Sequence, residues 1–513
     1  MKQFIKILFA VSMGVLVLPS CKRSLLDIEN PNTITVDQFW KTETDAEKGL
    51  TAIYSMFYKP GVWARWIYFR LDLTSDEGFS KSPWIELADW TRFQYINYNF
   101  WEGNAWTWRD TYKAIFRCNQ VLAYVPEIPF ADNNKKELIL AQAKFLRALY
   151  YYYAAILWEN VPLVLDPSKP EDLPEQRPLA DVWAQVEKDL TEALPVLPAV
   201  WDDANLGRPT KGAVNAYLAR TLMQQRKWEQ AKTVLDYFFT GEGAGKYDLV
   251  ANYQDNFRHT TENNIESVFE IQFSDANKGP DNDDPNQNMG SHRAQFFAPR
   301  GIGWSDGQAR FWLVNEFKKE KTVDNKIDPR LRYTLFYPDL EADFGDKIYG
   351  RNWDPDWGND EAWFRKYQRD YFRNNEDYFS QNNFRLVRYA DILLMYAEVL
   401  NELNQTATAA EHVDRVRARV NLAPLADNHP AALASKDAFR ERLKMERALE
   451  LCGESVRWAD LKRWGDLDSQ EKVDIVRQRD PDFNNFVVGK HIRLPIPQTE
   501  DLNNPNLEQN DKY

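Results

Sequence analysis

Cys21 is the residue whose position most clearly predicts a chemical modification. Lysines near the start of the chain are followed by an apolar run over residues 7–19, and Ser20 stands directly before the cysteine. A basic start, roughly 7–15 apolar residues and a small residue at the cut are typical of a secretory signal. A cysteine directly after the cut resembles a bacterial lipobox, whose thiol is diacylated and becomes the new N-terminus. We predict a signal peptide over residues 1–20 and a lipid on Cys21; because Pro19 is unusual in a lipobox, the alternative is an ordinary signal with a chance cysteine.

The rest of the chain shows no arrangement typical of catalysis. No glycine-rich phosphate loop or nucleophile elbow occurs. With 77 Asp and Glu residues, carboxylates at the separation that glycosidases use arise by chance, so acidity is no evidence for hydrolysis. The five histidines lack metal-ligand spacing; they are His259, His292, His412, His429 and His491. We expect no enzyme activity, no cofactor and no metal, with calcium in the acidic loops Asp281–Asn286 and Asp354–Gly358 as the alternative, although neither has EF-hand spacing.

Composition restricts the class of protein. A net charge of -13 argues against nucleic-acid binding, which relies on clustered Lys and Arg. No stretch after the N-terminal run approaches the roughly 20 apolar residues of a membrane-spanning helix. Cys118 and Cys452 stand in helical-looking sequence, so we expect buried free thiols rather than a disulfide. Aromatic residues make up 14% of the chain, and their flat apolar faces with polar edges suit either a core or a surface that holds amphipathic ligands.

Amphipathic helices must position these residues. Apolar side chains recur every three or four residues over 138–156 and again over 388–403, which predicts two helices. Shorter helices are predicted near residues 45–58, 106–125, 179–194, 408–419 and 437–451.

Residues 211–238 have the helix–turn–helix pattern of a tetratricopeptide repeat, or of a generic helical hairpin. A small residue stands where the two helices approach, and the apolar faces consist of Leu218, Ala219 and Leu222, then Trp228, Ala231, Leu235 and Phe238. Such a pair cannot bury its apolar face alone, so we expect it to pack against the pairs at 106–158 and 388–419.

Between residues 241 and 385 the helical pattern fades, and Gly, Asn, Asp, Pro and aromatics dominate. A strand is predicted at Ser267–Phe273. We therefore predict a mainly α fold: a tetratricopeptide-repeat-like helical scaffold over about 40–240 and 386–465, a loop-rich and partly β inserted lobe over about 241–385, and a C-terminal tail over 466–513.

Seven short motifs occur in the order typical of one family. They are Leu25–Asp27 with Phe39-Trp40; Trp108–Asn119 (W-x3-Y-x2-I-x3-N); Ala143–Ala148 with Val161-Pro162-Leu163; Arg388–Glu398 with Asn401-Glu402; Val416–Arg419; Arg457–Trp464; and Pro495–Pro497. Together they resemble the SusD/RagB-like lipoproteins of Bacteroidetes over nearly the whole chain. Two turns depart from the family pattern, at Glu159-Asn160 and at Cys452–Glu454.

The resemblance implies a function. Members of this family are non-catalytic, sit on the outer membrane facing the cell exterior, bind glycans or other nutrients and cap a SusC-type TonB-dependent transporter. We therefore expect capture of an oligo- or polysaccharide. The alternatives are capture of oligopeptides, a lipid-anchored surface glycosidase or esterase, and a purely structural partner of the transporter.

A glycan site needs exposed Trp or Tyr faces, which stack on the apolar face of a sugar, and polar side chains at their edges. Two non-helical segments have this mixture, Ser82–Trp106 and Gly301–Trp304, the latter followed by further tryptophans. We predict the ligand-binding residues Trp304, Trp90, Trp101, Trp84, Arg92, Asn104 and Trp357. The charges of the C-terminal motifs are instead predicted to pair in the interior; they are Arg388, Asp391, Glu398, Arg457, Asp460 and Arg463.

Overall fold

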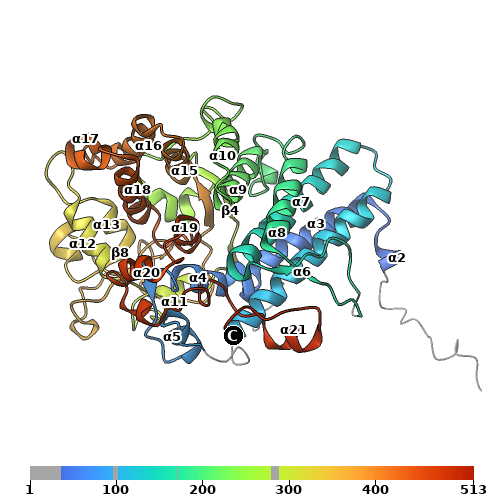
Figure 1. Ribbon diagram of the computed structural model, residues 1–513, viewed down its shortest axis with the longest axis horizontal. Coiled ribbons are helices and arrows are strands. Elements are labelled where there is room, and N and C mark those ends of the chain that lie inside the picture. Colours follow the sequence, from blue (N-terminus) through green and yellow to red (C-terminus); the bar gives the residue numbers. More distant parts are fainter. Residues whose placement is uncertain (1–35, 96–101, 170, 279–287) are drawn as a thin grey trace, which may run out of the picture.

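The computed structural model describes residues 36–95, 102–169, 171–278 and 288–513. Within them helices predominate, and the named strands pair only as two-stranded antiparallel sheets (Figure 1). The predicted signal peptide, Cys21 and Trp101 lie outside the described residues. The N-terminal helices are α2 (Val36–Phe39), α3 (Glu43–Tyr54), α4 (Trp66–Asp72), α5 (Ile85–Thr91), α6 (Glu102–Tyr124), α7 (Asn133–Trp158), α8 (Leu179–Ala193), α9 (Lys211–Gln224) and α10 (Trp228–Leu235).

The helices stack in sequence as hairpins. Helix α7 packs against α6 and α8, α8 against α9, and α9 against α10. Helix α10 then packs against α15 (Tyr389–Glu402), which pairs with α16 (Thr406–Ala418). The predicted tetratricopeptide-repeat-like scaffold is therefore confirmed, and it continues across the segment 241–385 that interrupts it in sequence.

Local signals fix where these helices begin. The Thr42 hydroxyl accepts a hydrogen bond from the Asp45 amide, and the Asp45 carboxylate accepts one from the Thr42 amide, which is a capping box at the start of α3. Asp132 and Thr210 cap α7 and α9 in the simpler way, by accepting from backbone amides of the first turn. The predicted positions of these helices are confirmed to within a few residues.

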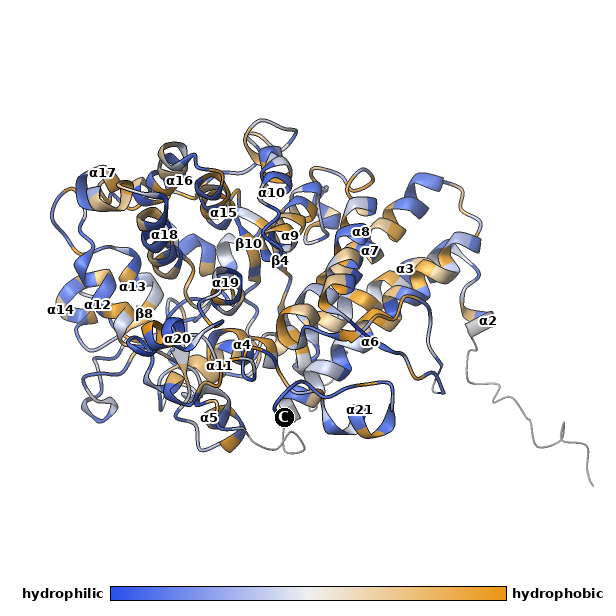
Figure 2. Cartoon of the chain, in the orientation of Figure 1, coloured by the Kyte–Doolittle hydropathy of each residue, from blue (hydrophilic) through white to orange (hydrophobic). Residues whose placement is uncertain are grey.

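The scaffold and the interrupting segment share one apolar core. Phe145 of α7 packs edge-on against Tyr217 of α9 and against Phe269 of strand β4 (Ser267–Ile271), with ring centroids 5.9 and 5.1 Å apart. Figure 2 shows hydrophobic residues concentrated along α3, α6 and α7, whereas peripheral connections are mostly hydrophilic. Cys118 and Cys452 are buried free thiols as predicted, and burial raises the pKa of both, so neither is reactive.

The segment 241–385 contains short elements joined by long connections. Strand β4 pairs with β10 (Phe384–Arg388), which confirms the predicted strand and leads directly into α15. The other pairs are β1 (Gly78–Phe79) with β7 (Gln308–Ala309), β2 (Val161–Pro162) with β3 (Gln176–Arg177), β5 (Ser274–Lys278) with β6 (Asn288–Met289), and β8 (Leu335–Phe336) with β9 (Trp363–Phe364). The helices here are α11 (Arg293–Phe297), α12 (Trp312–Lys319), α13 (Arg330–Thr334) and α14 (Leu340–Phe344).

A buried charge network fastens this segment to the C-terminal helices. Arg388 is 1% exposed, and its guanidinium contacts Glu266, Glu450 and Glu454 at 2.5–2.8 Å. The network comprises Arg330, Arg388, Arg417 and Arg419 with Glu266, Glu320, Glu446, Glu450 and Glu454. The remaining C-terminal helices are α17 (Leu425–Asn428), α18 (Lys436–Leu451), α19 (Arg457–Trp464), α20 (Gln470–Arg477) and α21 (Gln498–Asn503).

The other charges of the C-terminal motifs are also paired inside the protein. Asp391 bonds to Arg220 and Arg447, and Glu398 bonds bidentately to Arg463. The predicted interior pairing is confirmed, because all six motif charges are less than a tenth exposed. The C-terminal motifs therefore specify packing in this chain.

Candidate functional site

Trp304 presents the most exposed tryptophan face among the described residues, with 54% of its surface accessible. Its ring stands edge-on to Phe296, with centroids 4.8 Å apart, and lies 5.5 Å from the ring of Tyr378. Phe296 is buried and Tyr378 is partly exposed. The indole is thus supported from below while its outer face remains available to a ligand.

The loop that carries Trp304 is held rigidly against α11. The Trp304 amide donates to the Gln295 carbonyl at 2.8 Å, and the Asp306 amide donates to the Phe296 carbonyl at 2.8 Å. Gly303 allows this close approach, since a Cβ there would lie 2.4 Å from the Gln295 oxygen. A fixed backbone reduces the entropy lost when the indole holds a ligand.

Arg65 lies among the aromatic rings. Its guanidinium carbon is 5.5 Å from the Tyr378 centroid and 5.9 Å from the Trp106 centroid. It also donates to the Tyr378 hydroxyl and, at 3.3 Å, to Nδ1 of His292. Burial and the neighbouring Arg65 hold the pKa of His292 well below its usual range, so that imidazole is neutral. We call Trp304, Tyr378, Trp106 and Arg65 the aromatic platform.

Polar side chains surround the aromatic platform. Arg109 is 54% exposed by its side chain and lies 5.1 Å from the Trp106 centroid, where it pairs with Asp110. Arg351 donates to the carbonyl of Gly301, three residues before Trp304, and to the Asn375 side chain. Apolar faces with charged and amide edges are the combination that the two sides of a sugar ring require.

Only some of the ligand-binding residues predicted from the sequence lie exposed at or near the aromatic platform. Trp304 is exposed as expected. Trp84 is partly exposed, 5.0 Å from the buried Trp66, and joins the same region because its neighbour Ser82 donates to Asp306 beyond Trp304. Arg92 is exposed at the end of α5. The ligand contacts assigned to these residues stay predictions.

Three predicted residues lie in the interior, which corrects the expectation that they face a ligand. Trp90 is 2% exposed, because α5 turns it onto Trp66. Asn104 is 1% exposed and uses its amide to bond to the Pro495 carbonyl and the Trp158 indole. Trp357 is 5% exposed and donates to the Arg300 carbonyl. Their polar atoms serve the fold.

Sequence reasoning missed Tyr378, Arg65 and the role of Trp106. Arg65 and Tyr378 are 313 residues apart in the chain and meet only in the folded protein. No local pattern distinguishes them from other aromatic or basic residues. Trp106 is the last residue of the segment Ser82–Trp106 selected from the sequence. It lies in α6 at a spacing typical of a core position, so the sequence did not indicate a role in the site.

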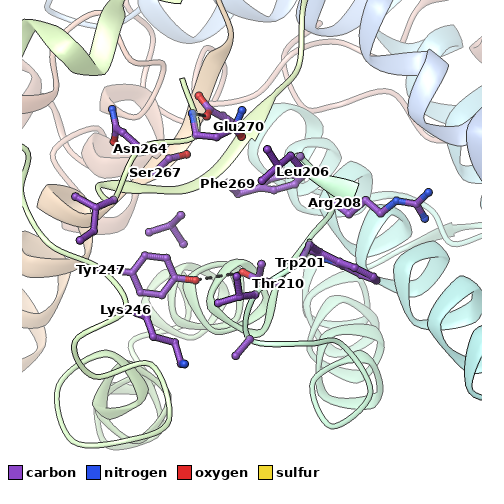
Figure 3. Close-up of a pocket in the computed structure, with 16 residues that line it drawn as sticks. Trp201, Leu206, Arg208, Thr210, Lys246, Tyr247, Asn264, Ser267, Phe269 and Glu270 are labelled. Carbon is purple, nitrogen blue, oxygen red and sulfur yellow. Dashed lines mark hydrogen bonds between the residues drawn. The ribbon is translucent and has the colours of Figure 1, made fainter. Parts of the chain in front are cut away.

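A cavity separate from the aromatic platform lies beside strand β4 (Figure 3). It has a volume of about 230 Å³, and the connection after α8 forms one wall with Trp201, Leu206 and Arg208. Thr210 and Tyr247, whose hydroxyls are 3.3 Å apart, form another wall. None of its lining residues belongs to the aromatic platform. Its exposed large apolar side chains are the aliphatic Val200, Leu206 and Ile265, so it offers a sugar less exposed ring surface than the platform does.

Asp306, which fastens the Trp304 loop to Ser82, gives a test by pH. Burial raises its pKa to about 6, and the Ser82 hydrogen bond offsets this only partly. The folded protein therefore holds the proton more tightly than the unfolded chain, so this group's contribution to stability falls as pH rises from about 4 to about 6. We expect Asp306→Asn to raise the free energy of unfolding by about 2 kcal/mol at pH 7.5 and to leave it unchanged at pH 4.

Chemical denaturation of both proteins at the two pH values measures this difference. A variant of equal or lower stability at pH 7.5 would show that the Asp306 carboxylate is stabilising.

The described residues contain no group of three His, Cys, Asp or Glu side chains able to hold a metal ion. Of the two acidic loops, Asp354–Gly358 is described, and there the Asp354 carboxylate caps a short 3₁₀ turn. Over the same residues, no helix has both the length and the hydropathy needed to cross a bilayer.

Sequence comparison resolves the family. Residues 265–513 match the family described as "SusD family", and residues 25–223 match the one described as "Starch-binding associating with outer membrane". The chain belongs to the SusD/RagB-like family. It is 27% identical over 540 residues to a SusD-like protein of Formosa agariphila, with all of both chains covered.

Solved SusD-like structures share the fold. A SusD superfamily protein of Bacteroides vulgatus superposes with a TM-score of 0.80 at 24% identity, covering 93% of this chain and all of that one. A laminarin-binding SusD-like protein superposes with a TM-score of 0.76 at 27% identity, covering 92% of this chain and all of that one. SusD-like relatives thus include carbohydrate-binding proteins, and the fold and the resemblance in sequence agree.

Proposed function

We propose that this SusD-like protein captures a glycan at the aromatic platform, without catalysis, and passes it to a SusC-type TonB-dependent transporter in the outer membrane. The observation that carries the proposal is Trp304, an exposed indole on a rigid loop, flanked by Tyr378 and Trp106 and edged by polar groups. The laminarin-binding relative supports a carbohydrate ligand. We keep Trp84 and Arg92, which the sequence predicted, as further residues of the proposed site.

Affinity electrophoresis and calorimetry across a panel of polysaccharides test this proposal, with laminarin as the first probe. We expect saturable binding to at least one glycan and no release of reducing ends. Binding to oligopeptides alone would replace glycan capture with peptide capture. Turnover that disappears on mutating one Asp or Glu would make the protein a glycosidase.

We further propose that acyl chains on Cys21 anchor the protein to the outer membrane, facing the cell exterior. One chain gives only marginal membrane binding, whereas two suffice for stable anchoring. Cys21→Ala should therefore move the protein from the membrane fraction to the soluble fraction, as measured by fractionation and immunoblotting. If the Cys21→Ala variant stays fully in the membrane fraction of cells that lack the transporter, the lipid is not the anchor.

A further inference from the structure

A large cavity lies at the far end of the α9–α10 hairpin, where five helices converge. Its volume is about 520 Å³, within the range of small-molecule pockets. Its residues come from the turn before α10, the end of α15, the start of α18, the end of α19, and α20. None of them belongs to the aromatic platform, so whatever this cavity binds is bound separately.

Basic side chains dominate the cavity in a protein of net charge -13. Six basic and four acidic side chains line it: Arg226, Arg440, Lys444, Arg463, Lys472 and Arg479, against Glu398, Glu402, Glu441 and Asp466. The local sign of charge is therefore opposite to that of the whole molecule.

Every lining carboxylate is already paired. Glu398 accepts both branches of Arg463 at 2.8 Å, and Glu402 accepts from Arg440 at 2.6 Å. Lys444 lies 2.9 Å from Glu441 and 2.8 Å from Asp466. The acidic groups thus neutralise neighbouring cations and cannot repel an incoming anion with their full charge.

Two of the lining cations lack a carboxylate partner among the described residues. Lys472 donates to the Gly465 carbonyl at 3.0 Å, and Arg226 makes no ion pair within the same part of the chain. Both side chains are exposed. They leave two positive charges available at the mouth of the cavity.

Arg226 occupies a backbone position that normally selects glycine. Its φ is 57°, and its amide bonds to the Met223 carbonyl while the Lys227 amide bonds to the Leu222 carbonyl, which closes α9 with a Schellman turn. Helix α19 ends with the same turn and has Gly465 there. An arginine in this left-handed conformation is less favourable than the glycine that the turn prefers.

Arg226 lines the cavity, and its guanidinium lies against the α19 turn. A Cβ added to Gly465 would lie 3.3 Å from Nη2 of Arg226 and 2.5 Å from a carboxylate oxygen of Asp468, so this carboxylate also lies near the turn and offsets part of the arginine's charge without an ion pair to it among the described residues. Trp228, partly exposed two residues away, and Ile475, 51% exposed, supply apolar wall beside it. The cavity thus combines a cation with an indole, which suits an anionic group carried on a ring.

We propose that this cavity is a second, acidic-sugar site, which binds a saccharide unit carrying a carboxylate such as a uronic acid. The carboxylate pairs with Arg226 and Lys472, and the ring lies against Trp228. The site adds to the proposed glycan capture, but its ligand and its residues differ from those of the aromatic platform, so either can fail without the other.

Calorimetry with oligogalacturonate tests the site, with Arg226→Gly as the decisive variant. This change removes the cation and places at φ 57° the residue that the turn prefers, so the melting temperature should stay the same or rise. We expect oligogalacturonate affinity to fall about 10-fold or more, as for loss of one charge-assisted hydrogen bond. Trp304→Ala should bind oligogalacturonate as tightly as the native protein.

Each other outcome overturns the proposal. Equal affinity of the native and Arg226→Gly proteins, or no binding by the native protein, excludes the site. Loss of binding in Trp304→Ala assigns acidic sugars to the platform instead. Equally tight binding of inorganic sulfate, in place of the much weaker binding expected, would mean an adventitious ion only.

Discussion

Replacing Trp304 with alanine is expected to weaken glycan binding about 30-fold. An aromatic residue at the centre of a carbohydrate site acts as a hot spot whose truncation costs about 2 kcal/mol, and every 1.4 kcal/mol is tenfold in affinity. The indole is rigidly held and more than half exposed, so most of its outer face is free for a ligand. Calorimetric titration with laminarin, or with the best ligand of the panel, measures the change.

Two controls isolate stacking from folding. Trp304→Phe keeps an aromatic face and should retain most of the affinity. Phe372 is similarly exposed, at 48%, but packs beside His259 instead of the platform, so Phe372→Ala should bind glycan normally. All three variants should melt within a degree or two of the native protein. Unchanged affinity in Trp304→Ala would remove the platform from the site.

Arg388→Ala is expected to lower the free energy of unfolding by about 3–5 kcal/mol, the largest stability effect in the molecule that we predict. Removing one partner of a buried ion network leaves the others buried and uncompensated. Arg388 touches three carboxylates at once, those of Glu266, Glu450 and Glu454, all of which are inaccessible to solvent or nearly so. A loss of this size is a large fraction of the 5–15 kcal/mol that typically holds a domain together.

Urea denaturation followed by circular dichroism measures the loss. The exposed pair of Arg177 and Asp181 provides the matched control, and Arg177→Ala should cost less than about 1 kcal/mol. Arg388→Lys keeps the positive charge but loses the planar guanidinium, so its loss of unfolding free energy should lie between those of Arg388→Ala and Arg177→Ala. A loss below about 1 kcal/mol for Arg388→Ala would mean that the remaining cations re-pair with the three carboxylates.

Lowering the pH should also reduce the stability that the same network contributes. Burial by itself raises the pKa of Glu450, but Arg419, Arg388 and Arg330 outweigh it and hold that pKa below its usual range. A carboxyl whose folded pKa is depressed contributes stability above its unfolded pKa of about 4.3, and loses it as pH falls further.

The scaffold could be predicted from the sequence because the signals for a helix lie within short stretches of it. The apolar periodicity of α7 and α15 and the caps Thr42, Asp132 and Thr210 are all contained within short windows. The pairing of the motif charges was also predictable, since charged residues on an otherwise apolar helix require buried partners.

The ligand-binding residues were harder to predict from the sequence, because a tryptophan side chain occurs both in a core and on a binding surface. Trp90 and Trp304 stand in similar surroundings in the sequence, yet α5 turns the first onto Trp66 while a glycine-containing loop exposes the second. Tyr378 and Arg65 enter the platform only through tertiary contact. Exposure depends on how the long connections fold back, which the periodicity of a single chain does not encode.

The buried charge network also governs when the chain can become native. Its members extend from Glu266 to Glu454, so it closes only after the last third of the polypeptide is available. Contacts between residues so far apart in the sequence form slowly, because the chain loses loop-closure entropy before these contacts can stabilise it. The N-terminal portion alone therefore lacks the partners of this network. Under the export that we propose for this chain, that delay would leave the network open until the C-terminal helices have been made.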